Sequence, residues 1–139
     1  MGTTRSLGLD IGDKRIGVAL SDPGGILASP FTIINRGDEK QDIEAIADIV
    51  NQNQVERIVV GLPRSMDGSV GRQAEKVKSF IEGLSSHIEV PLEFRDERLT
   101  TVSAKRLIRE ASTKKAKKKV RYDAVAAAII LQGYLDERH

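Results

Sequence analysis

The stretch LGLDIGDKRIGVALSD, residues 7–22, holds two short apolar runs separated by a polar turn. The composition of these runs predicts two strands, over 5–11 and 15–21. The connecting GDK predicts a hairpin-type turn in which Gly12 takes a positive φ. A carboxylate, Asp10, stands near the end of the first run, although this strand is expected to enter the core. The role of this acid is therefore the first question about the function of the protein.

Length and composition restrict the class of protein. The chain has 139 residues, which suits a single domain over 1–139. It contains no Cys, so neither a disulfide framework nor a Cys-type metal site is available. No apolar run approaches the length of a membrane span, and the first residues lack a signal-peptide profile. We therefore expect a soluble, cytoplasmic protein with no membrane partner.

Positive charge is concentrated in one part of the chain. Residues 98–121 contain ten Lys or Arg and one acid, Glu110, so this segment carries +9. The whole chain carries +2, which leaves −7 for all other residues. A basic segment on an acidic body favours a polyanionic partner such as nucleic acid. The alternative is a solvated loop, which is the usual role of a lysine run.

The remaining sequence continues with one more strand and then alternates helices with strands. The candidate strand 26–34 contains Pro30, which predicts an edge position or a bulge. Asp38 and Gln41 predict a capping box at the start of a helix. Further strands are expected over 55–63 and 88–97, and further helices over 69–84, 100–110 and 120–135.

This order of elements predicts an α/β fold. The first three strands are joined by short turns and should be antiparallel, whereas the later two are reached through helices and should run parallel to the first. The expected result is a mixed five-stranded sheet with helices on both faces. The last helix is apolar on nearly every side, so it should be largely enclosed.

Acidic residues fall where such a sheet binds ligands, outside the carboxyl ends of its strands. Asp10 ends the first strand, Asp96 and Glu97 end the fifth, and Asp123 opens the alanine-rich last helix. Three converging carboxylates stay ionised only if cations lie between them. Oxygen donors without His or Cys favour Mg²⁺ or Mn²⁺. Two such ions about 4 Å apart could clamp the attacking and leaving oxygens of a phosphodiester.

Each acid also has an ordinary structural explanation. Asp10 could begin the turn, Asp96 and Glu97 could be surface residues, and Asp123 could be the N-cap of its helix. The convergence of three acids favours the metal site. The sequence pattern does not choose between Asp96 and Glu97.

Four segments together resemble one family. LGLDIGDKRIGVALSD, IVVGLPRSMDGSVGRQAEKVKSFI, DERLTTVSAKRLI and YDAVAAAIILQGYL look like the YqgF family, also called the RuvX type, over about 8–135. The resemblance implies an RNase H-like fold and a metal-dependent nuclease with Asp10, Glu97 and Asp123 as the catalytic, metal-binding triad. It is the resemblance that selects Glu97 over Asp96. The family is named for Holliday junction resolution and is also linked to 5′-end maturation of small-subunit ribosomal RNA.

The expected partner is structured RNA or branched DNA, with ribosome-assembly factors as further partners. A junction has two-fold symmetry and would call for a homodimer, whereas trimming an RNA end would need only a monomer. Cations are expected to bind phosphates and to give affinity without base specificity. These cations are Lys14, Arg15, Arg98, Lys114, Lys115, Lys117, Lys118, Lys119 and Arg121.

Two other functions fit parts of the sequence. Actin-like ATPases also carry Asp-x-Gly in a first hairpin, but they enclose their nucleotide between two domains and this chain supplies one. A non-catalytic module that binds nucleic acid or the ribosome could retain the same fold, with the three acids in structural roles.

Overall fold

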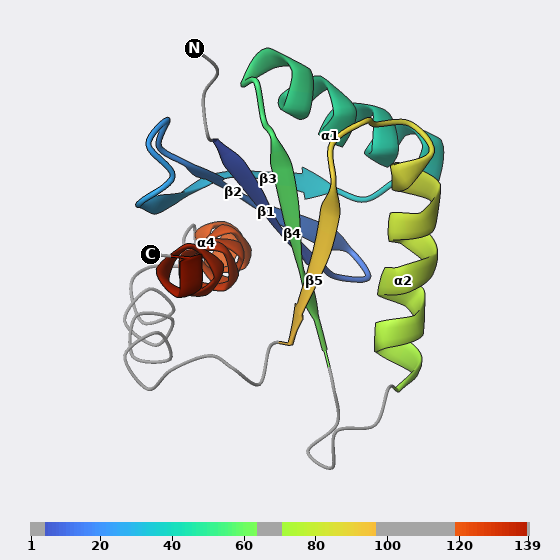
Figure 1. The fold of residues 1–139 in the computed structure, drawn as a ribbon. Helices are drawn as coiled ribbons and strands as arrows, with labels where there is room; N and C mark the ends of the chain where they lie inside the picture. Colours follow the sequence, from blue (N-terminus) through green and yellow to red (C-terminus); the bar gives the residue numbers. More distant parts are fainter. Residues whose placement is uncertain (1–4, 64–70, 97–118, 139) are drawn as a thin grey trace.

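Five strands form one mixed sheet within the residues that the structure describes. The computed structural model describes residues 5–63, 71–96 and 119–138, with side chains in the last range from Ala124 onward. The strand order is β3-β2-β1-β4-β5 (Figure 1). β1 pairs antiparallel with β2 and parallel with β4, which confirms the predicted mixed sheet. The strands are β1 (Ser6–Ile11), β2 (Arg15–Ser21), β3 (Ala28–Asn35), β4 (Arg57–Leu62) and β5 (Leu92–Asp96).

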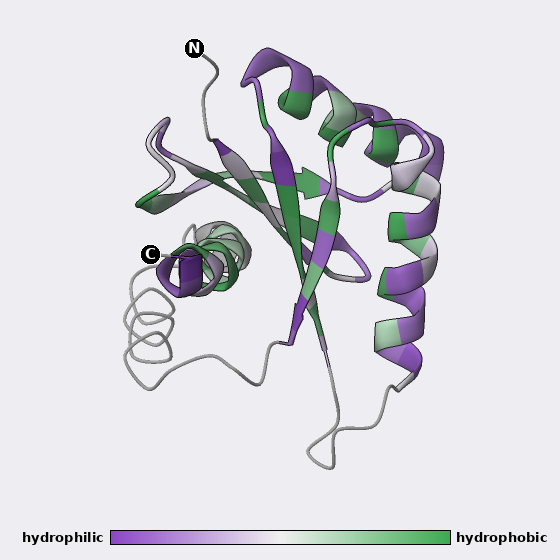
Figure 2. Ribbon diagram, viewed as in Figure 1, coloured by the Kyte–Doolittle hydropathy of each residue, from purple (hydrophilic) through white to green (hydrophobic). Residues whose placement is uncertain are grey.

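Helices cover both faces of this sheet, as predicted. α1 (Glu39–Gln52) and α2 (Arg72–Ser85) pack on one face, and α4 (Lys119–Arg138) lies on the other (Figure 1). The apolar stripes of α1 and α2 point at the sheet while their outer faces are polar (Figure 2). None of residues 124–135 of α4 is fully exposed, in agreement with its expected enclosure. No helix within the described residues is both long enough and apolar enough to cross a bilayer.

Pro30 occupies the kind of position that its chemistry requires. It lies in β3, which is an edge strand, and the β2–β3 register shifts between Val18 and Ala19. Val18 pairs with Thr32 and Ala19 pairs with Pro30, so the chain bulges between these two positions. Because proline has no amide proton, this bulge at an edge leaves the ladder of the central strands intact.

The prediction of a positive φ at Gly12 is wrong. In this region of the chain the glycine with a positive φ is Gly25, at 72°. Gly12 is required for another reason: a Cβ there would lie 2.8 Å from the carbonyl oxygen of Arg15. The Gly12 amide donates to that same oxygen across 2.8 Å, so the turn closes only when no side chain is present.

Two helix starts also differ from prediction. Asp38 is the N-cap of α1, but its side chain makes no capping hydrogen bond, so the capping box with Gln41 is absent. Asp42 in the first turn instead accepts the Gly37 amide at 3.2 Å. α4 begins at Lys119, so Asp123 neither opens the helix nor serves as its N-cap.

Other predicted boundaries shift by a few residues. β5 is shorter than the predicted 88–97, and the Pro91 carbonyl accepts the Ile58 amide just before the strand begins. α2 begins at Arg72 with Gly71 as its N-cap rather than near residue 69. The predicted helix 100–110 lies outside the described residues.

The loop between β2 and β3 is organised by one carboxylate. Asp22 accepts backbone amides from Ile26 at 2.7 Å, Leu27 at 2.8 Å and Gly24 at 3.3 Å. The bonds from Leu27 and Ile26 hold the pKa of Asp22 below its usual value of 3.8. Since the folded pKa is the lower one, ionised Asp22 stabilises the loop above pH 3.8, and this contribution is lost as the pH falls through the folded pKa.

We therefore expect the amides of Ile26 and Leu27 to lose protection in acid. Nuclear magnetic resonance should show these two amides shifting together with a midpoint below pH 3.8. In Asp22→Asn, which keeps the shape and removes the charge, the same amides should exchange faster at neutral pH. Equal exchange in the variant and the native chain would show that the charge does not organise the loop.

Candidate active site

Asp10 does not point into the apolar core. Leu7, Leu9 and Ile11 belong to the large core cluster shared with α1 and α2. Successive side chains of a strand alternate between faces, so Gly8 and Asp10 lie on the opposite face, which α4 covers. We call this the α4 face of the sheet. Asp10 is partly buried there, at the carboxyl end of β1, which explains how an apolar strand tolerates an acid.

Glycines flank Asp10 on both neighbouring strands. Gly17 of β2 pairs directly with Asp10. On the other side, Leu9 pairs with Val60 of β4, and Gly61 is the next residue along that strand. Neither glycine contributes a side chain to the α4 face. The positions next to Asp10 on both neighbouring strands therefore carry no side chain on the α4 face.

α4 packs closely against β1. A Cβ on Gly8 would lie 2.8 Å from both the carbonyl oxygen of Ala127 and the Cβ of Leu131. The absence of a side chain at Gly8 therefore allows α4 to lie this close to the sheet. Farther along α4, Leu135 lines a cavity together with Ser6 at the opposite end of β1. α4 thus runs from the Asp10 end of β1 towards its Ser6 end, with Asp123 one helical turn before Ala127.

The structure separates Asp96 from the α4 face. Arg95 reaches α4, where its Nη1 pairs with Glu137 Oε2 at 2.7 Å and its guanidinium would contact a Cβ on Gly133. Arg95 therefore lies on the α4 face of β5. Its neighbour Asp96, which pairs with Leu62, lies on the opposite face from Asp10. Glu97 lies outside the described residues.

Two of the predicted cations belong to the hairpin that carries Asp10. Lys14 is exposed in the β1–β2 turn, and Arg15 is partly buried at the start of β2. Arg15 precedes Gly17 by two residues, so both lie on the α4 face with Asp10. The backbones of Lys119 and Arg121 belong to the first turn of α4, and their side chains are outside the description. The other predicted cations, Arg98, Lys114, Lys115, Lys117 and Lys118, lie outside the described residues.

The predicted metal site lies partly outside the described residues. Among the side chains that the structure describes, no three of His, Asp or Glu lie close enough together to hold a metal ion. Of the predicted triad, only the Asp10 side chain is described; Glu97 and the side chain of Asp123 are not. The donor set itself consists of three carboxylates, which suits a hard divalent cation.

A cavity of about 250 Å³ lies at the other end of the sheet. It is lined by Ser6, Glu56, Arg57, Tyr134 and Arg138, among others. Both arginines donate to the Tyr134 hydroxyl, and burial raises the pKa of that group above its usual value of 10.0. Glu56 in the lining and Glu93 beside Arg57 offset the two arginines. This balanced cluster lies far along β1 from Asp10 and offers no excess charge to a phosphate.

The sequence patterns do not predict a polar network that holds the turn after Asp10. Arg36 follows β3 and contacts the Gly12 carbonyl, while Asp42 in α1 contacts Arg36. The sequence signal for this network was the position of Asp42, an acid next to Ile43 on the apolar stripe of a helix. In the structure Asp42 is only 3% exposed.

Comparison with known proteins places the chain in a family. Proteins called "Putative pre-16S rRNA nuclease" in Desulforamulus reducens and Clostridium novyi are 48% and 49% identical to it over 132 residues. These matches cover 95% of this chain and 96% and 98% of the two relatives.

Solved structures show the same fold at low identity. Thermus thermophilus RuvC in complex with a Holliday junction substrate matches with a TM-score of 0.66 and 11% identity, over 97% of this chain and 95% of that one. The fowlpox virus resolvase with its junction DNA matches with a TM-score of 0.58 and 12% identity, over 97% and 99%. These likenesses confirm the RNase H-like architecture expected from the sequence. The family model described as "RuvX: Holliday junction resolvase" matches residues 4–137, and the chain therefore belongs to the RuvX family.

Proposed function

We propose that this chain is a metal-dependent nuclease that hydrolyses phosphodiester bonds in structured RNA, in the maturation of the 5′ end of small-subunit ribosomal RNA. The observation that carries the proposal is Asp10, held on the α4 face between two glycines at the carboxyl end of β1. Membership of a nuclease family supports the reaction. RNA is favoured because the relatives named for it are nearly half identical, whereas the junction-bound structures are 11–12% identical.

Asp10, Glu97 and Asp123 would hold two divalent ions, Mg²⁺ or Mn²⁺, which when bound supply an activated water and stabilise the leaving oxygen. The family resemblance selects Glu97 over Asp96 for this role. Asp96 itself lies on the face of β5 opposite to the one that Asp10 occupies, which argues against Asp96 as the ligand. The close contact of Gly8 with Ala127 supports Asp123, because it brings the first turns of α4 towards Asp10.

The cations have a separate role in this proposal. Arg15 shares the α4 face with Asp10, and Lys14 adjoins it in the exposed turn, so both could contact phosphates next to the bond that is cut. The lysine run, which consists of Lys114, Lys115, Lys117, Lys118 and Lys119, would hold phosphates farther from the bond that is cut. These contacts would give affinity without sequence preference.

A cleavage assay tests the proposal. The purified chain is incubated with an RNA that carries a 5′ extension of small-subunit ribosomal RNA, or with a four-way DNA junction, in Mg²⁺, Mn²⁺ or chelator. We expect metal-dependent cutting of the RNA. If only the junction is cut, the proposed function becomes junction resolution instead of RNA maturation. Junction resolution is the activity for which the family is named. Binding of either substrate without cutting, at saturating Mn²⁺, would show a non-catalytic module and overturn the nuclease.

The role of the lysine run is tested by salt dependence. Each lysine that neutralises a phosphate adds about 0.9 to the slope of log K against log salt on duplex and about 0.7 on single strands. Changing Lys117, Lys118 and Lys119 to Ala should therefore flatten the slope by about 2 to 3. Cleavage at saturating substrate should survive, because the proposed metal ligands are untouched.

The matched control removes the same charge from α1 and α2. Lys40, Lys76 and Lys78 are exposed on α1 and α2, and changing these three to Ala should leave the slope unchanged. Equal slopes in the two triple variants would place the path of the nucleic acid elsewhere. Intact binding with lost cleavage would give the lysine run a role in positioning Asp123 instead.

A further inference from the structure

One arginine from outside the hairpin, Arg36, makes two hydrogen bonds to the turn that follows Asp10. Gly12, two residues after Asp10, starts the turn. Its amide donates a hydrogen bond to the Arg15 carbonyl on the other side of the turn. Arg36, just after β3, donates its backbone amide to the Lys14 carbonyl at 2.9 Å. The Arg36 Nη1 donates to the Gly12 carbonyl at 3.0 Å. Arg36 thus holds both ends of the turn that connects Asp10 to Lys14 and Arg15.

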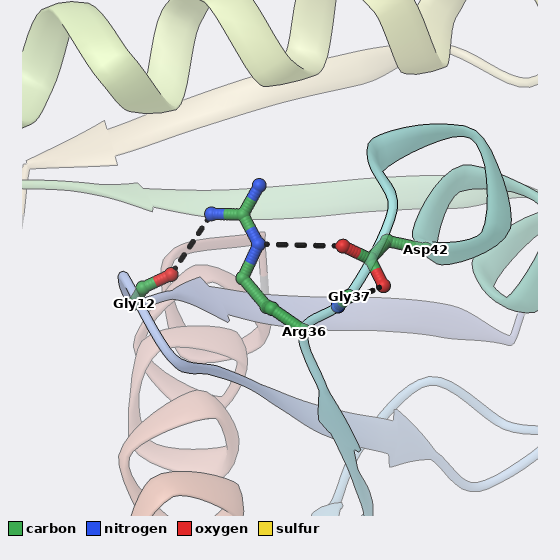
Figure 3. A network of polar contacts seen from close by, with 4 residues as sticks. All are labelled: Gly12, Arg36, Gly37 and Asp42. Carbon is green, nitrogen blue, oxygen red and sulfur yellow. Dashed lines mark hydrogen bonds and ion pairs between the residues drawn. The ribbon is translucent and has the colours of Figure 1, made fainter.

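Arg36 is itself held on two further sides. Its Nε lies 3.5 Å from Asp42 Oδ2, and its guanidinium carbon lies 4.8 Å from the centroid of the Phe80 ring. Figure 3 shows the Arg36 side chain reaching from the end of its strand between Gly12 and Asp42. The Asp42 side chain is 4% exposed and also accepts the Gly37 amide. The guanidinium therefore has little freedom to leave the Gly12 carbonyl.

A partly buried ion pair of this kind adds little to stability by itself. Removing two charges from water costs about as much as their attraction returns, and apolar replacements often do as well. The pair instead fixes geometry, because a guanidinium presents several donors in one rigid plane. In this turn the fixed geometry is that of the backbone next to Asp10.

We infer that Arg36, oriented by Asp42, is a positioning residue for Asp10. It holds the β1–β2 turn so that the Asp10 carboxylate and the cations Lys14 and Arg15 keep one arrangement relative to the substrate. This inference rests on the proposed function, since it assigns Asp10 a metal to bind. Partners that orient a metal ligand typically contribute 10- to 100-fold to metal affinity, and we expect about 10-fold here because Arg36 acts through the backbone.

The test uses two variants and one control. Arg36→Lys keeps the charge beside Asp42, but a single ammonium group cannot span Asp42 and the Gly12 carbonyl as the guanidinium does. Arg36→Met combined with Asp42→Asn removes both charges and keeps an apolar stem over Phe80. The control, Val50→Ala in α1, shortens a core side chain that is 5% exposed and leaves the turn untouched.

Two readouts are independent of cleavage. Hydrogen exchange at the Gly12 amide, in protein without metal, should be about 10-fold faster in both Arg36 variants and unchanged in Val50→Ala. Mn²⁺ affinity, measured by water-proton relaxation, should fall about 10-fold in the Arg36 variants and stay native in the control, whatever the unfolding temperatures.

The outcomes separate the two proposals. If the native chain binds no Mn²⁺, the proposed function fails and this inference fails with it. If the native chain binds Mn²⁺ and the Arg36 variants match it in both readouts, only the inference is overturned. The same holds if Val50→Ala weakens Mn²⁺ binding as much as the Arg36 variants do, because general destabilisation would then explain the loss.

Discussion

Replacement of Asp10 by asparagine is expected to lower the rate of RNA cleavage about a thousandfold at saturating metal. The change keeps the shape of the side chain but removes one ionic ligand from the proposed metal pair. Metal stabilisation of a phosphoryl transition state is worth several kcal/mol, and about 4 kcal/mol corresponds to three orders of magnitude in rate. Single-turnover cleavage of the end-labelled RNA measures this loss.

Asp13→Asn is the matched control for charge. Asp13 lies three residues after Asp10 in the same hairpin, and its side chain is 63% exposed, 3.6 Å from Lys76 Nζ. This variant should cleave at the native rate. A loss of similar size in both variants would mean that the hairpin tolerates no change of charge, and Asp10 would lose its special role.

The stability of Asp10→Asn should change in the opposite direction to its activity. Clustered carboxylates without metal repel one another, so in chelator the variant should unfold at an equal or higher temperature than the native chain. A clear loss of stability would favour a structural role for Asp10 in starting the turn.

Gly8→Ala is expected to have the second large effect. The new Cβ would lie 2.8 Å from a backbone carbonyl of α4 and from the Leu131 Cβ, and neither can rotate away. α4 must then move off the sheet, at a cost of about 3 kcal/mol in the free energy of unfolding. For a chain of this length that corresponds to roughly a 10 °C drop in Tm. Cleavage well below this Tm should also fall, because α4 carries Asp123.

Gly37→Ala is the control for loss of glycine. A Cβ at Gly37 would meet nothing within 4 Å, and its φ is not in the left-handed region. Its Tm and cleavage rate should be native. A native Tm in Gly8→Ala would contradict the close seating of α4 that brings Asp123 towards Asp10. Calorimetry of the three proteins side by side decides the point.

Much of the fold follows from local patterns in the sequence. The turns between the first strands and the apolar stripes of the helices were enough to predict the sheet and the two covered faces. The position of Pro30 was predictable because proline lacks an amide proton and is therefore restricted to an edge strand or a bulge. The buried residues of α2 recur at the spacing of one helix face and are Ala74, Val77, Phe80, Ile81 and Leu84.

Features that depend on particular contacts between backbone and side-chain atoms were not predicted. Gly12 was assigned a positive φ because that is a common reason for glycine in a turn, yet the reason here is the approach of the Arg15 carbonyl. The predicted capping box is absent because the Asp38 side chain makes no capping hydrogen bond, and Asp42 accepts the amide of Gly37 before the helix. Arg36 was missed because its partners come from the first hairpin and from two helices.

The candidate site was predicted by residue type more than by geometry. Which face of the sheet Asp10 occupies depends on the packing of α4, whose contact with Gly8 joins residues more than 100 positions apart. The choice between Asp96 and Glu97 came from family resemblance, and the structure places Asp96 on the face of β5 opposite to Asp10. The predicted roles of Glu97 and Asp123 stay predictions.

The most direct test of the metal site is anomalous diffraction from crystals of the native chain soaked in Mn²⁺. We expect two Mn²⁺ peaks about 4 Å apart on the α4 face, at least one of them coordinated by Asp10, with Glu97 and Asp123 completing the ligands. Crystals of Asp10→Asn, soaked in the same way, should lose at least one peak. Mn²⁺ bound at another site, or no ordered Mn²⁺ near Asp10 at saturating concentration, would contradict the account.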